Sequence, residues 1–191
     1  MAKGVWLHRL RLIRIIAVVP DLYKQSNLAQ FEAALWMLHD CIRKCPDEHW
    51  SGPTSIIGKY EFWHVVHHTL ACTDSYLSPN EESHVFLPEF YPAGARDVED
   101  EYPSRTFSKD EMLSFVAHCL AKLRRSIPVE TEESLRGPSG FSWVKINRAE
   151  LHLYSVRHVM HHTGMLSASL RRLNLPEDAQ PRWGFTGWRD D

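Results

Sequence analysis

The sequence predicts an all-α protein, a four-helix bundle with long crossover loops. Four segments show the spacing of apolar residues that is typical of long amphipathic helices, and turns containing proline or glycine separate them. The sequence contains no convincing strand alternation and no internal repeat. With 191 residues the chain has the length of one domain, since domains commonly have about 100–200 residues. Two of the connections are long, and helix bundles accommodate such crossovers.

The beginning of the chain differs from the rest in charge. It contains one lysine and three arginines before Pro20, but no acidic residue. We expect residues 1–20 to be a basic, poorly ordered leader, and residues 21–191 to form the single domain. A signal or transit peptide is the alternative interpretation. The apolar run is short, however, is interrupted by Arg14 and lacks a cleavage site of small residues.

The first two helices are bounded by turns that contain proline. The first helix is expected over residues 22–44, and the second from Ser55 or Gly58 to Leu77. A connection over residues 79–106 follows, and it is rich in proline, acidic and aromatic residues. Because loops of this length in a compact domain are commonly functional, we expect the connection to shape a pocket.

The last two helices begin at clear start signals. Ser108 followed by Glu111 forms a capping box, which predicts a helix over residues 109–126. A second connection with glycine and proline leads to the fourth helix, expected over residues 147–172. The tail of residues 182–191 contains two tryptophans and a phenylalanine, so we expect it to dock on the bundle.

Histidines at helical spacing indicate a metal site. His158 and His162 are four residues apart, so they lie one turn apart on the core-directed face of the fourth helix, with His161 nearer its edge. The second helix carries a further cluster, His64, His67 and His68. One imidazole from the second helix and two from the fourth would provide three protein ligands, which is the pattern of an open, catalytic zinc site.

Other interpretations of these histidines stay open. They could be core or surface histidines with local hydrogen bonds, or Cys72, one turn beyond His68, could be a fourth ligand that closes the site. Asp74, Glu61 and Glu150 are candidate partners of the ligands, since metal-binding histidines usually donate their second N–H to a carboxylate or carbonyl oxygen.

Composition excludes several classes of function. A formal net charge of −2 gives no electrostatic basis for nucleic-acid binding, and no apolar run approaches the ~18 residues of a membrane span. The four cysteines have no paired CxxC spacing and fall in helix-like segments, which is typical of reduced thiols in a cytoplasmic protein. The GxSxG, phosphate-loop and GxGxxG motifs are also absent from the sequence.

Two segments carry a resemblance to a known family. Residues 62–77, FWHVVHHTLACTDSYL, and residues 153–172, LYSVRHVMHHTGMLSASLRR, resemble motifs of the DinB-like superfamily of metalloenzymes. This superfamily includes thiol-dependent S-transferases and maleylpyruvate isomerases. The connection LPEFYPAGARD and the segment FSKDEMLSF are also similar to the family's passage into its third helix.

The resemblance implies an up-down-down-up bundle that binds one divalent metal ion through three histidines. We expect this ion to be zinc, nickel or another divalent metal. Carried over onto this sequence, the ligands are His68, His158 and His162, whereas His67 and His161 are neighbours. One departure is Met165, where many members have glutamine. If that glutamine holds substrate or water, its loss puts the standard activity in doubt.

A three-histidine metal site of this kind leads us to expect metal-assisted hydrolysis or transfer of a low-molecular-weight thiol. The ion would activate water or a thiol, and His161, Tyr76 and Cys72 are candidate pocket residues for a small-molecule substrate. The alternative is a non-catalytic binding or stress-response bundle that is stabilised by its metal. A homodimer is also considered, since such bundles often pair through exposed helix faces.

Overall fold

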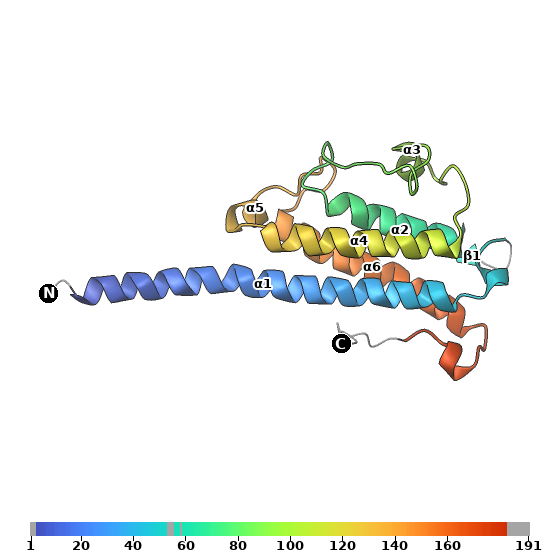
Figure 1. Ribbon diagram of the computed structural model, residues 1–191, viewed down its shortest axis with the longest axis horizontal. Coiled ribbons are helices and arrows are strands. Elements are labelled where there is room, and N and C mark those ends of the chain that lie inside the picture. The colour runs from blue at the N-terminus through green and yellow to red at the C-terminus, as the bar shows by residue number, and fades with distance from the viewer. Residues whose placement is uncertain (1–2, 53–55, 58, 183–191) are drawn as a thin grey trace.

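Four main helices pack together in the computed structural model (Figure 1). They are α1 (Lys3–Lys44), α2 (Phe62–Tyr76), α4 (Lys109–Val129) and α6 (Arg148–Arg171). Helices α1 and α2 each pack against both α4 and α6. The all-α class that the sequence predicts is therefore confirmed.

The structure describes residues 3–52, 56–57 and 59–182, with side chains from residue 21 onward except that of Ile56. The tail expected to dock on the bundle lies almost entirely outside these residues. Within the described ranges, no helix combines the length and the apolar character that a bilayer crossing requires.

The core lies between the four main helices and consists of apolar side chains at helical spacing. Phe31, Leu35, Leu38 and Ile42 of α1 recur every three or four residues, and each is fully buried. Burial of one such side chain contributes about 1.5–3 kcal/mol. Buried partners on the other helices include Val66 and Leu70 of α2, Phe115 and Leu123 of α4, and Val159 and Leu166 of α6.

Helix α1 begins earlier than the sequence suggests. It starts at Lys3 rather than at Leu22, and its first half projects beyond the other helices (Figure 1). Pro20 lies inside this helix. A proline removes one helical hydrogen bond and disfavours the helix, but it does not always end the helix. For this reason Pro20 did not mark the true start of α1. The division into a leader of residues 1–20 and a domain of residues 21–191 stays a prediction.

A short β-hairpin precedes α2, which contradicts the expectation of a chain without strands. Strands β1 (Ile56–Ile57) and β2 (Tyr60–Glu61) pair antiparallel, with Ile57 opposite Tyr60. Helix α2 consequently begins at Phe62, later than Ser55 or Gly58. Strands of two residues are too short to produce a recognisable alternation in sequence.

The capping box at the start of α4 is confirmed. The Glu111 amide donates to Ser108 Oγ at 3.3 Å, and the Ser108 amide donates to Glu111 Oε2 at 2.7 Å. The helix continues to Val129, past the expected end at Ser126, and includes Pro128 in its last turn.

Both long connections contain short helices that the sequence did not indicate. Helix α3 (Arg96–Glu99) lies in the first connection, above α2 in Figure 1, and α5 (Glu132–Arg136) lies in the second. The carboxylate of Asp97 accepts hydrogen bonds from the amides of Ala93 and Ser104, at 2.6 and 2.7 Å. This buried carboxylate therefore folds the first connection around α3.

Helix α6 begins and ends close to the expected positions. Asn147 caps its first turn, because the Glu150 amide donates to Asn147 Oδ1 at 2.8 Å. After Arg171 the chain turns at Asn174, whose φ of 51° is a left-handed conformation that asparagine tolerates. Two short 3-10 turns, Asp47–His49 and Glu177–Ala179, complete the described elements.

Candidate metal centre

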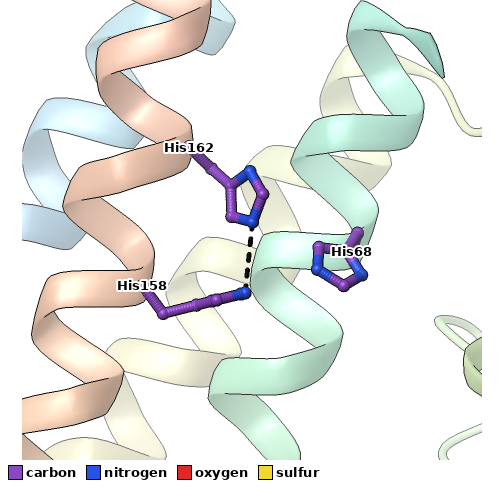
Figure 2. Close-up of side chains that lie close together, drawn as sticks. All are labelled: His68, His158 and His162. Carbon is purple, nitrogen blue, oxygen red and sulfur yellow. Dashed lines mark hydrogen bonds between the residues drawn. The ribbon is translucent and has the colours of Figure 1, made fainter. Parts of the chain in front are cut away.

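The seam between α2 and α6 brings three histidines together. His68 projects from α2, and His158 and His162 project from successive turns of α6 (Figure 2). Each offers one ring nitrogen, and the three nitrogens all lie within 4.8 Å of one another. These are the three residues that the sequence pattern and the resemblance select, so the fold places the predicted ligands in one cluster that could hold a metal ion.

The two histidines of α6 already have the separation of neighbouring metal ligands. Their Nε2 atoms are 3.1 Å apart (Figure 2). Two nitrogens bound at about 2.0–2.1 Å to one ion lie about 2.8–3.4 Å apart at angles between 90° and the tetrahedral value. The pair therefore fits an ion without a change in its own spacing. His68 completes the cluster with its ring centroid 5.2 Å from that of His158 and 5.0 Å from that of His162.

The surroundings of the cluster lower the pKa of its imidazoles, which favours the neutral form that binds metals. Burial, together with the neighbouring His68 and His161, lowers the pKa of His158 to about 4. Burial and the nearby histidines lower the pKa of His162 to about 3, and burial also lowers the pKa of His68. A metal ion does not have to displace protons from these rings at neutral pH.

The three carboxylates expected to support the ligands lie elsewhere, so that expectation is wrong. Asp74 is on another side of α2, where it accepts a hydrogen bond from Tyr91 Oη at 2.9 Å. Glu61 accepts from Trp63 Nε1 at 2.7 Å, and Glu150 occupies the capping box at the start of α6. The second ring nitrogen of His162, Nδ1, consequently receives no support from a carboxylate: it is buried and has no hydrogen-bond partner in the described part of the chain.

Cys72 lies beside the cluster but outside it. Its Sγ is 3.9 Å from Nε2 of His68, and it does not belong to the group of atoms that lie within 4.8 Å of one another. Burial raises the pKa of the Cys72 thiol to about 12. The geometry therefore groups three candidate ligands rather than four.

Two cavities flank this part of α2. A cavity of about 390 Å³ lies beside the cluster, and its lining includes His68, His161, His162 and Met165. A second cavity of about 690 Å³ is lined by residues that include Cys72 and Tyr76. His161 is thus at the cluster's own cavity, whereas Tyr76 and Cys72 line the neighbouring one.

The first long connection forms a wall of both cavities. Val98 of α3 lines both, and Asp97, Asp100 and Glu101 line the smaller one. The expectation that this connection shapes a pocket therefore agrees with the structure. The pattern analysis did not single out His64 as a pocket residue, although its position four residues before His68 could have indicated this.

The other histidine of the second cluster has a structural role. Nε2 of His67 is 3.0 Å from the carbonyl oxygen of Phe90, and its ring stacks on Phe107 with centroids 4.7 Å apart. This buried ring therefore connects α2 to the long connection. It is not a member of the cluster, in agreement with the residue-by-residue comparison of motifs.

Comparison of the chain with protein-family models, with curated proteins and with solved structures finds no match. The DinB-like resemblance consequently rests on the motifs alone. The three-histidine cluster is the observation from which a function can be argued.

Proposed function

We propose that this protein is a metal-dependent enzyme of the DinB-like type, which activates water or a low-molecular-weight thiol for hydrolysis or S-transfer. The observation that carries the proposal is the convergence of three imidazoles from two helices. The up-down-down-up topology, the choice of zinc or nickel and a second copy of the chain as partner belong to the same proposal and rest on the sequence. So does a cytoplasmic location, which the four free cysteines support.

His68, His158 and His162 would hold the ion. A divalent ion bound by three imidazoles supplies Lewis acidity, which lowers the pKa of coordinated water to about 7 and deprotonates a coordinated thiol. The three histidines would bind the ion and hold it beside the cavity, because the packing of α2 on α6 fixes the separation of their rings. Three protein ligands leave room in the coordination shell for water or a thiol.

The cavity beside the cluster would receive the substrate. Its volume of about 390 Å³ suits a small molecule. Met165 offers an apolar contact, and His161, which is exposed on α6, offers a polar one. Acidic residues of the long connection also line this cavity, so the connection would select substrates by size and polarity.

A non-catalytic role is the competing proposal, and one observation favours it. Because the cluster joins α2 to α6, an ion there would link two helices that are distant in sequence. Such a link stabilises the bundle whether or not a reaction follows. The two proposals differ in whether the ion exchanges its water for a small molecule.

Metal analysis tests the site on which both proposals depend. Protein purified without a histidine tag or chelator should contain about one zinc or nickel per chain. His68→Ala and His158→Ala should each lose it, because two imidazoles bind far more weakly than three. His39→Ala is the control, since His39 lies on α1 outside the cluster. A wild-type protein without metal after reconstitution and dialysis would overturn both proposals.

A screen with the metal-loaded protein separates the enzyme from the structural bundle. Turnover of a thiol-transfer or hydrolytic substrate, lost in His158→Ala and kept in His39→Ala, supports the enzyme. A metal whose spectrum does not respond to any added thiol or small anion, with no turnover, supports the structural role.

A further inference from the structure

The imidazole of His64 is buried beside the cluster, and one of its ring nitrogens has no hydrogen-bond partner among the described residues. His64 is 7% exposed, and it lines the same cavity as His68 and His162. Its Nδ1 is shielded from solvent and has no partner among the residues that the structure describes. Because buried polar atoms nearly always form hydrogen bonds, this nitrogen is suited to a partner that is not part of the protein.

Aromatic side chains hold this ring in place. The ring of Tyr102 lies at a centroid distance of 4.5 Å, and that of Tyr60 stands perpendicular to it at 4.8 Å. His67, by comparison, has a main-chain partner in the carbonyl oxygen of Phe90. The environment of His64 therefore orients the imidazole and leaves its Nδ1 without a partner among the described residues.

The carboxylates of the same cavity are already occupied. The two oxygens of Asp97 accept backbone hydrogen bonds. Glu101 is paired with Lys59, and Asp100 is paired with Arg96 at 3.2 Å. His64 is thus a polar group of this cavity that remains available for a ligand.

The position of His64 places it close to the cluster. It lies one helical turn before His68 on α2, and residues four apart on a helix have Cβ atoms about 6 Å apart. Burial and the neighbouring histidines lower the pKa of His64 to about 4. The neutral ring has one donor and one acceptor nitrogen, so it can pair with a hydroxyl or an amide.

We propose that His64 is a specificity-determining residue, whose imidazole hydrogen-bonds a polar group of the small molecule held at the three-histidine cluster. The inference rests on the proposed function, because it requires an ion at the cluster. The ligand class is a small molecule with two functional groups: one atom that binds the ion and, a few bonds away, a hydroxyl or amide that reaches His64.

Cobalt-loaded protein provides a direct test with two thiols as probes. We expect 2-mercaptoethanol, which carries a hydroxyl, to bind the wild-type protein more tightly than ethanethiol, as measured by the cobalt–thiolate absorption. His64→Phe should lower the preference by about 2- to 10-fold, the effect of one neutral hydrogen bond. The cobalt content should stay at the wild-type value, and thermal stability without thiol should be equal or higher, since the phenyl ring removes an unpaired buried nitrogen.

The controls separate the possible failures. His39→Phe should keep the preference, because His39 contacts Trp36 and does not line the cavity. His64→Gln retains a hydrogen-bonding group and should keep part of the preference for 2-mercaptoethanol. This variant replaces His64→Phe in the test if His64→Phe does not fold. Loss of cobalt in His64→Phe would overturn the inference by making His64 a metal ligand. Equal binding of the two thiols by the wild type, or no binding, would also overturn it, whereas a wild type that takes up no cobalt would overturn the proposed function as well.

Discussion

Cys72 decides between an open and a closed site at the scale of single residues. Its thiol is 3.9 Å from Nε2 of His68, and burial raises its pKa to about 12. This thiol is not a member of the three-histidine cluster, whose ring nitrogens all lie within 4.8 Å of one another. We therefore expect Cys72→Ser to retain about one metal per chain, as measured by elemental analysis after dialysis.

His162→Ala is the matched comparison and should lose its metal under the same dialysis. A Cys72→Ser variant that loses metal as readily as His162→Ala would identify Cys72 as a fourth ligand. That outcome would favour the structural role of the ion, since closed four-ligand sites leave no position for a substrate.

Part of the candidate centre could be predicted from residue spacing, and part could not. Four residues make about one helical turn, so His158 and His162 necessarily share a face of α6. The choice of His68 within its own cluster of histidines required the motif resemblance. Spacing does not reveal which neighbouring element covers each face of a helix. For that reason Asp74 was expected near the ligands, although it faces α4 and the long connection.

At the scale of elements, Asp74 connects α2 to α4 and to the first long connection. Its carboxylate accepts from Lys122 Nζ at 2.7 Å and from Tyr91 Oη at 2.9 Å, and lies 3.0 Å from Nε2 of His118. Asp74→Asn should lower the free energy of unfolding by about 3–5 kcal/mol, because it leaves Lys122 with an uncompensated, largely buried charge. Chemical denaturation at pH 7 measures this loss.

The contribution of Asp74 should depend on pH. Burial alone would raise its pKa, but the hydrogen bonds and charges of His118 and Lys122 hold the pKa at about 2. An aspartate in the unfolded chain titrates near 3.9, so the stabilisation is complete above about pH 4 and is lost as the pH falls toward 2. The difference between wild type and Asp74→Asn should shrink over this interval. Asp178→Asn, on the exposed 3-10 turn, should match the wild type at every pH.

The boundaries of elements follow from local signals only where those signals are strong. The capping box of Ser108 predicts the start of α4, because both of its hydrogen bonds lie within four residues. Helix α3 has no such local signal. Its place in the loop depends on the carboxylate of Asp97, which accepts hydrogen bonds from one amide before the helix and one after it. The hairpin before α2 contains only two residue pairs, and its stability depends on packing against α2 and α6.

At the scale of the whole molecule, the centre occupies the seam between two helices that are far apart in sequence. Helix α2 provides one ligand and α6 provides two, and the first long connection covers the adjacent cavity. Folding is therefore required to assemble the three ligands. An ion that binds them favours the folded state over the unfolded state.

Metal addition should consequently raise the temperature of unfolding. Free metal at about 100 times its dissociation constant stabilises the folded state by about 2.7 kcal/mol. For a chain of this length, about 2–4 °C is expected for each kcal/mol, so the midpoint should rise by about 5–10 °C in a thermal scan and return when a chelator is added. His68→Ala should show little or no rise, because it removes the ligand that α2 provides, whereas His39→Ala should respond as the wild type does. An equal rise in His68→Ala would mean that α6 binds the ion without α2, and the ion would then not connect the two helices.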